Sequence, residues 1–249
     1  MSLEYGEYTD RGLVREVNQD AIYSYSGENL SLFLVADGMG GHSRGEKASG
    51  AIAECVKEWS NNFYPAKYAN GFPEILADFE KKIAEANARH ISYIGKGEIC
   101  GSTMVALMFY REYYAVFSIG DSRVYRRRGW DFEQLTRDDV WQNSGDLPGG
   151  MSAEDIRRHA DFDKLTKAFG VGESLILQRM TDKIKKGDFF LLCSDGVYKF
   201  VPEDFLKKTL SAGLFAKKTT IKEKIETIKK KVLERGASDN FSMILVQVV

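Results

Sequence analysis

The chain of 249 residues has little of several features that mark particular protein classes. It has three cysteines and four prolines, and no apolar run approaches the ~18 residues that a membrane-spanning helix needs. The N-terminus lacks the basic-then-apolar pattern of a secretion signal. An odd number of cysteines, at spacings that fit no zinc ribbon, argues against a disulfide framework and indicates reduced thiols in a cytoplasmic protein.

The chain also has no excess of charge of one sign. The 35 basic and 36 acidic residues nearly cancel, so no net field favours nucleic acid or acidic lipid, and we expect neither a nucleic-acid nor a membrane partner. Hydrophobic residues make up 43% of the chain and charged residues 29%, which is typical of a globular domain. Because no repeat, low-complexity tract or proline-rich linker divides the sequence, we predict a single domain over residues 1–249.

Hydrophobic patterns predict more strands than helices. Apolar, β-branched or aromatic runs predict strands at 3–9, 21–26, 31–36, 102–110, 113–119, 122–127, 175–181, 188–193 and 241–248. Helical spacing of apolar residues predicts helices around 48–59, 76–86, 202–210 and 221–232. Tight turns between antiparallel neighbours are expected at 110–113 and 120–121. Since strands and helices do not alternate regularly, we predict an α+β fold of antiparallel sheets with helices packed outside.

Aspartates fall at the edges of these predicted strands, namely at Asp20, Asp37, Asp121, Asp195 and Asp239. A carboxylate at a buried strand end is costly to desolvate unless a cation or a hydrogen-bond network meets it. Carboxylates without a histidine or cysteine cluster favour hard ions such as Mg²⁺ or Mn²⁺. The alternative is that each Asp-Gly pair is simply a turn, and spacing by itself does not bring the five together.

A glycine-rich segment follows Asp37 and joins a predicted strand to a predicted helix. Glycine lets the backbone approach a ligand closely, and the carbonyl of Gly38 is a candidate oxygen ligand. A dinucleotide-binding loop is excluded, because after Gly38 and Gly40 the third glycine of that motif would fall at Ser43.

Seven short segments resemble, in the same order, the motifs of the bacterial metal-dependent protein phosphatases, the PPM or type-2C serine/threonine phosphatases. These segments are 9–20, 34–42, 101–103, 119–123, 165–170, 194–196 and 238–240. The resemblance implies an α-β-β-α sandwich, in which two antiparallel sheets are flanked by helices and two divalent ions bind at one end. It also implies that residues 137–172, which have weak periodicity, are the variable flap beside the metal site.

The resemblance assigns roles to the aspartates. Asp37 is expected to bridge the two ions, with the Gly38 carbonyl on one of them. Asp195 and Asp239 are expected to hold the other ion.

Other residues are expected to support these ligands. Asp20 would act through metal-bound water, and Asp121 would help to bind a weaker third ion. Arg15 matches the phosphate-binding arginine of the family. We expect His42 to give the leaving oxygen its proton, although relatives place that histidine where this chain has Met39. The alternative for His42 is a structural loop residue.

Together these features predict hydrolysis of phosphoserine and phosphothreonine in proteins, by a hydroxide that bridges two Mn²⁺ or Mg²⁺ ions. The expected substrates are proteins phosphorylated by a bacterial serine/threonine kinase, and we expect a monomer. One alternative is a phosphatase dedicated to a single regulatory protein. Another is a non-catalytic phosphopeptide-binding scaffold of the same fold, which the retained aspartates disfavour.

Overall fold

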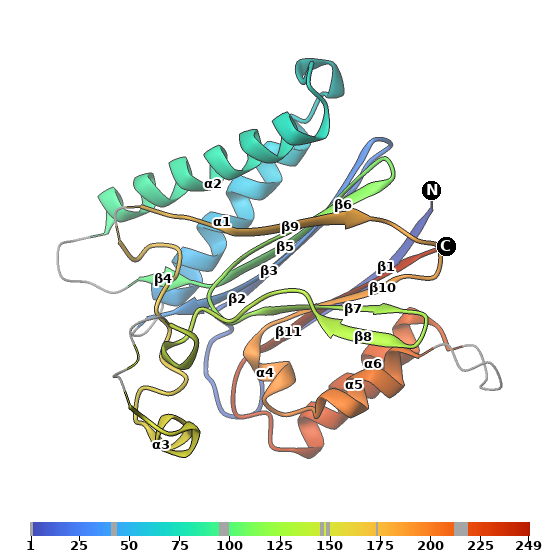
Figure 1. The fold of residues 1–249 in the computed structure, drawn as a ribbon. Coiled ribbons are helices and arrows are strands. Elements are labelled where there is room, and N and C mark those ends of the chain that lie inside the picture. The colour runs from blue at the N-terminus through green and yellow to red at the C-terminus, as the bar shows by residue number, and fades with distance from the viewer. Residues whose placement is uncertain are drawn as a thin grey trace.

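A computed structural model describes residues 2–40, 44–94, 100–144, 147, 150–172, 174–211 and 219–249. Its strands form two sheets that lie face to face (Figure 1), and the pairing within both sheets is antiparallel. The first sheet has the order β1 (Leu3–Asp10), β11 (Phe241–Val248), β10 (Phe189–Cys193), β7 (Arg123–Arg128) and β8 (Asp131–Gln134). The second has the order β2 (Asp20–Ser26), β3 (Leu30–Met39), β5 (Met104–Tyr110), β6 (Tyr113–Ile119) and β9 (Gln178–Lys183), with β4 (Gly101–Ser102) paired to β3.

Helices cover the outer faces of both sheets (Figure 1). The second sheet carries α1 (Arg44–Asn61) and α2 (Phe72–Tyr93), and the first carries α4 (Asp195–Tyr198), α5 (Glu203–Leu210) and α6 (Ile221–Glu234). A short helix, α3 (Ala153–Arg158), stands apart from these layers, and single 3₁₀ turns occur at Pro65–Lys67 and Trp141–Asn143. The predicted α-β-β-α sandwich is therefore confirmed.

Strand β3 shows why the central strands read as unbroken apolar runs. Leu32 and Leu34 pack in the core under the helices, whereas Phe33 and Val35 pack in the core between the two sheets. Successive side chains of a strand point to opposite faces, so a strand that is buried on both faces needs apolar residues at every position.

Helix ends follow local sequence signals. In α6, Thr220 accepts a hydrogen bond from the Glu223 amide, and the Glu223 side chain binds back to the Thr220 amide, which is a capping box. The helix ends before Gly236, whose φ of 101° lies in the left-handed region that favours glycine. The sequence prediction of both the apolar stripe and its end is confirmed.

Some local predictions are wrong. The turn at 120–121 does not join sheet neighbours, because β6 and β7 belong to different sheets and the chain crosses between them there. Strand β3 continues past Asp37 to Met39, since β4 pairs with this extension. Pro202 takes the N-cap position of α5 rather than a place in its first turn. The short strand β8, which lacks an apolar run, was not predicted.

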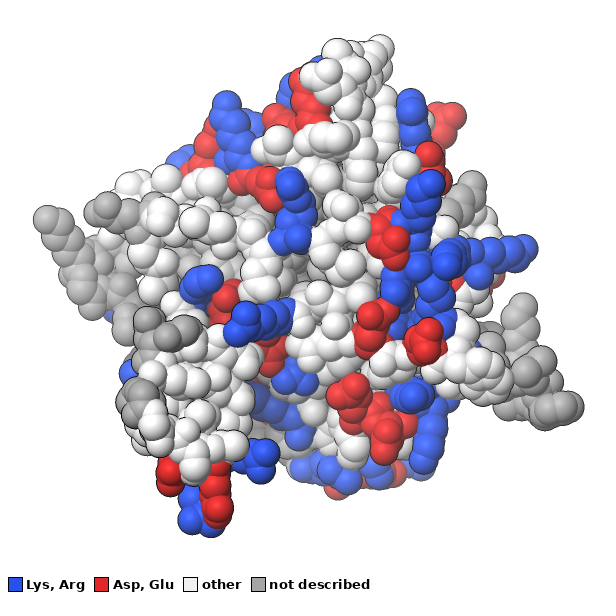
Figure 2. All heavy atoms as spheres, viewed as in Figure 1, with Lys and Arg blue, Asp and Glu red and all other residues white. Residues whose placement is uncertain are grey.

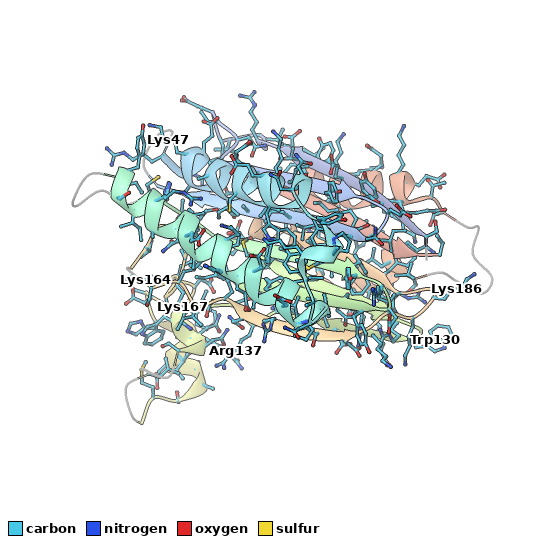
Figure 3. All side chains as sticks on the ribbon, turned by 90° about the horizontal axis from the view of Figure 1, so that it is seen from above. Lys47, Trp130, Arg137, Lys164, Lys167 and Lys186 are labelled. Atoms are coloured by element: carbon cyan, nitrogen blue, oxygen red, sulfur yellow. The ribbon has the colours of Figure 1, made fainter. Side chains whose placement is uncertain are left out.

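Residues 137–172, the predicted flap, contain one isolated bridge of their own, between Val140 and Leu165, and a second bridge joins Phe169 to Ser102 of β4. The Asp139 amide also donates to the Gly120 carbonyl at 2.8 Å. Lys164 and Lys167 lie at the flap end of the molecule, opposite the end that carries Trp130 (Figure 3). The described part of the segment around these two lysines therefore lies at one end of the sandwich.

Surface charges of both signs are interspersed over the face shown in Figure 2. Within the described ranges, no helix combines the length and apolarity that crossing a bilayer requires.

Candidate metal centre

Residues from distant parts of the chain line one cavity of about 590 Å³. The sequence-predicted site residues among them are Arg15, Asp37, Gly38, Asp121, Asp195 and Asp239. Asp163, Lys164 and Leu165 of the flap line the same cavity. The structure thus brings together residues that lie in or directly beside strands of both sheets, together with residues of the flap.

Asp20 lies directly behind this cavity. It is the register partner of Asp37 in the β2–β3 pair. The Ser194 hydroxyl donates to Asp20 Oδ2 at 2.8 Å, whereas Oδ1 is buried and finds no hydrogen-bond partner among the described residues. Burial, reinforced by the charges of Asp195 and Asp239, raises the pKa of Asp20 to about 7. An orphaned carboxylate oxygen in this position is suited to a cation or to water held by one.

The backbone around Asp37 is fixed by the neighbouring β4 segment. The Thr103 hydroxyl accepts from the Asp37 amide at 3.0 Å, and the Thr103 amide donates to the Asp37 carbonyl at 2.9 Å. Burial raises the pKa of the Asp37 carboxyl well above its usual range, and repulsion from Asp20, Asp195 and Asp121 raises it further. When several carboxylates repel one another in a site shielded from water, all of them can be ionised at once only if a cation offsets their charge.

Two glycines allow the backbone to close around this site. A Cβ on Gly38 would lie 2.2 Å from the Gly45 carbonyl oxygen, where β3 meets the first turn of α1. A Cβ on Gly196 would lie 1.9 Å from the Asn240 carbonyl oxygen. Because backbone atoms occupy the space that any side chain needs, both positions require glycine.

Two basic side chains contact the remaining carboxylates. Arg15 holds Asp239 through two parallel contacts of 2.9 Å, Nε to Oδ1 and Nη2 to Oδ2. Lys199 Nζ lies 2.6 Å from Asp195 Oδ2 and 3.9 Å from Asp121 Oδ2. Sequence analysis missed Lys199, although its position four residues after Asp195 places both on one face of a helical turn.

Asp121 sits in a polar network of its own. Only 6% of the residue is exposed, and burial together with the charge of Asp195 raises its pKa to about 6. The Tyr198 hydroxyl donates to Asp121 Oδ2 at 3.2 Å. The Arg123 guanidinium lies 3.6 Å from the centre of the Tyr198 ring and pairs with Asp138.

The segment that carries Arg15 is pinned by one side chain. Asn240 Oδ1 accepts from the Gln19 amide, and Nδ2 donates to the carbonyls of Arg11 and Val17, each at 2.9 Å. Asn240 fixes this segment against the start of β11, directly beside Asp239. Asn240, Ser194 and Thr103 lie within segments that the resemblance singled out, but sequence analysis did not predict these positioning roles.

Of the three histidines, His42, the expected proton donor, lies outside the described residues, and the other two make structural contacts. His90 is buried with Nε2 3.0 Å from the Cys100 carbonyl, and His159 stacks on Trp141 in the flap with 4.1 Å between ring centres. Neither His90 nor His159 is among the described residues that line the cavity.

The donor set fits ions that keep water in their coordination shell. Across the described ranges, no three His, Cys, Asp or Glu side chains already converge as a ligand set for one ion. Mg²⁺ is commonly bound through only one or two carboxylates with water completing its octahedron, and Mn²⁺ also prefers carboxylate, carbonyl and water oxygens. Asp37, the Gly38 carbonyl, Asp195 and Asp239 offer this kind of set around one cavity.

Comparison with known proteins places the chain in a family. The family model for protein phosphatase 2C matches residues 14–228. The serine/threonine phosphatase Stp of Listeria monocytogenes is 30% identical over 245 residues, which cover 96% of this chain and 93% of that protein. The solved structure of PppA, a key regulatory component of T6SS in Pseudomonas aeruginosa, is 29% identical, with a TM-score of 0.80 and 100% and 99% of the two chains covered.

A second solved structure is informative about metal. The catalytic domain of PstP, a serine/threonine phosphatase of Mycobacterium tuberculosis, was solved in complex with two manganese ions. It is 25% identical with a TM-score of 0.78, and the alignment covers 99% of this chain and 98% of that one. The match over most of the chain, the shared fold and the aspartate-lined cavity show that the protein belongs to the protein phosphatase 2C family.

Proposed function

We propose that the chain hydrolyses phosphoserine and phosphothreonine in proteins, with two Mn²⁺ or Mg²⁺ ions held by aspartates. The observation that carries this proposal is the convergence of Asp37, Asp121, Asp195 and Asp239 on one cavity, where desolvation of Asp37 and repulsion from its neighbours favour a bound cation. Family membership and the activities named for the relatives support the substrate class. The manganese pair in PstP supports the number of ions.

Four groups would hold the two ions. Asp37 would be shared between them, the Gly38 carbonyl would complete one site, and Asp195 and Asp239 would hold the other. Asp20 would act from behind through water, which its unpartnered Oδ1 supports. When bound, such a pair of ions offsets the charge of the phosphate and activates water as a nucleophile.

Arg15 is the residue that we assign to phosphate binding. Its side chain is 55% exposed at the cavity, and Asp239 holds its guanidinium in a defined plane. A planar guanidinium presents paired donors whose spacing matches two phosphate oxygens. Asn240 fixes the segment that carries Arg15, so the guanidinium needs little reorganisation when the phosphate arrives.

His42 is proposed as the proton donor on sequence grounds, because it follows Asp37 by five residues. A histidine is suited to this step near neutral pH. In a His42→Ala variant, hydrolysis of a phosphopeptide, whose leaving group needs a proton, should slow much more than hydrolysis of an aryl phosphate. Equal slowing of both substrates would argue for a structural role.

The resemblance also implies a third ion on Asp121 and Asp195, but Lys199 already contacts both carboxylates.

The proposal also covers the substrates, the oligomeric state and the cellular location of the protein. The substrates would be products of a serine/threonine kinase, and a single monomeric domain over residues 1–249 would act on them. A cytoplasmic location is supported by the three cysteines, each of which is buried and without a disulfide. A non-catalytic scaffold is disfavoured because every proposed carboxylate ligand is present.

The proposal is tested by phosphate release from a phosphothreonine peptide with Mn²⁺, before and after chelation by EDTA. We expect activity that disappears with EDTA and returns with excess Mn²⁺. The Asp239→Asn variant should lose activity while circular dichroism shows an intact fold. Asp131→Asn, an exposed substitution in β8, is the matched control and should keep wild-type activity. Turnover without metal, or full activity of Asp239→Asn, would overturn the mechanism.

A further inference from the structure

Lys199 places a positive charge on two carboxylates that the family resemblance assigns to a third ion. Its Nζ lies 2.6 Å from Asp195 Oδ2 and 3.9 Å from Asp121 Oδ2. Both carboxylates line the cavity, and Lys199 lines it with them. The ammonium therefore contacts both carboxylates that a divalent ion shared by these residues would need.

The position of Lys199 follows from local helical geometry. The side chain lies one helical turn after Asp195, and the Lys199 amide donates to the Asp195 carbonyl at 3.0 Å. Side chains four residues apart on a helical turn face the same side. The ion pair with Asp195 is thus built into the turn, and the short Nζ–Oδ2 distance is that of a charge-assisted hydrogen bond.

Tyr198, the residue before Lys199, contacts the same carboxylate oxygen of Asp121. The Tyr198 hydroxyl donates to Asp121 Oδ2, the oxygen that Lys199 also approaches. The Tyr198 ring is packed under the Arg123 guanidinium, which Asp138 holds through contacts from both Nε and Nη2. Asp121 Oδ2 is therefore already supplied with a hydroxyl donor and a nearby ammonium.

Charge in this corner of the cavity is also partly balanced without a metal. Lys199 faces Asp195 and Asp121 in the body of the protein and Asp163 in the flap. A divalent ion placed on Asp195 Oδ2 and Asp121 Oδ2 would lie within a few ångströms of the ammonium, where two positive charges repel strongly. The ion would have to displace Lys199 before it could bind.

We propose that Lys199 is a built-in cation that takes the place of a third divalent ion, so that this phosphatase binds two ions rather than three. The inference rests on the proposed function, because it presupposes the two-ion site. It assigns Lys199 to the neutralisation of Asp121 and Asp195 on the side of the cavity that the flap borders.

The test is the number of Mn²⁺ ions bound at saturation, measured by equilibrium dialysis with metal analysis and by calorimetric titration. Wild-type protein should bind two ions. Lys199→Met, which keeps an unbranched side chain but no charge, should bind a third, weaker ion. Adding Asp121→Asn to that variant should return the count to two. Lys57→Met, which removes an exposed lysine paired with Glu54 on α1, is the control and should bind two.

Lys199→Gln is the second variant if Lys199→Met does not fold. Three bound ions in the wild type, or two bound ions in the folded Lys199 variants, would overturn the inference. The proposed function would still stand in either case if the protein binds Mn²⁺ and releases phosphate in a metal-dependent way. Wild-type protein that binds no Mn²⁺ and releases no phosphate would overturn the proposed function and this inference together.

Discussion

The ionisation of Asp20 should make the metal-free protein lose stability as the pH rises. The pKa of Asp20 is raised from an ordinary value of 3.8 to about 7, mainly because burial disfavours the charged carboxylate. The folded state therefore holds the proton more tightly than the unfolded state does. The contribution of Asp20 to the free energy of unfolding is fully present below about pH 4. It falls as the pH rises and is lost once the pH has passed about 7.

The size of this effect follows from the shift. A difference of roughly three pKa units corresponds to about 4 kcal/mol over the whole range, at ~1.4 kcal/mol per unit. Between pH 5 and pH 8, Asp20 should account for about 3 kcal/mol of the loss, since part of the range lies below pH 5. Asp20→Asn preserves the shape of the side chain and removes its ionisation, so the variant should lose this part of the pH dependence.

The assay is urea unfolding in EDTA at pH 5 and pH 8. The free energy of unfolding should drop more in the wild type than in Asp20→Asn, by about 3 kcal/mol, while the control Asp131→Asn keeps the wild-type drop. Saturating Mn²⁺ should reduce the wild-type drop, because a bound cation favours the charged carboxylates. Equal drops in wild type and Asp20→Asn would refute the assignment of a buried, uncompensated carboxyl at this position.

Two further substitutions test the site. Arg15→Lys keeps the charge but loses the planar pair of donors, so kcat/KM for a phosphopeptide should fall about tenfold. The control is Arg179→Lys, which changes an exposed arginine paired with Glu80 and should leave the kinetics unchanged. Unchanged kinetics in Arg15→Lys would argue against its role in phosphate binding. Gly196→Ala should lower the free energy of unfolding by about 1–3 kcal/mol or more, because its Cβ would lie 1.9 Å from a backbone oxygen. Gly50→Ala in α1, with nothing within 4 Å of the new Cβ, should be neutral or stabilising in the same denaturation assay, and equal behaviour of both alanine variants would contradict the close contact.

Sequence alone was sufficient where burial dictates a pattern. The runs that became β3, β5, β10 and β11 are apolar at nearly every position because the central strands are buried on both faces. The stripe of α6 and its end before Gly236 follow from helical spacing and from the need for a left-handed residue. The aspartates at strand edges were likewise visible, since each precedes, interrupts or follows an apolar run.

Other features depend on contacts that no local pattern encodes. The crossing at Gly120 looks like a hairpin turn in sequence, and only the packing of two sheets decides that β6 and β7 part there. Ser194 and Asn240 look like ordinary polar residues until the fold sets them against Asp20 and the Arg15 segment. Lys199 carries one local signal, its spacing from Asp195, but its contact with Asp121 joins residues 78 positions apart in the chain.

The most direct measurement of the central claim is anomalous diffraction from crystals of the protein soaked in Mn²⁺. The account predicts two strong anomalous peaks in the cavity, both beside Asp37, with Asp195 and Asp239 within coordination distance of one of them. Peaks that lie elsewhere, or a cavity without manganese in a protein that still releases phosphate, would contradict it.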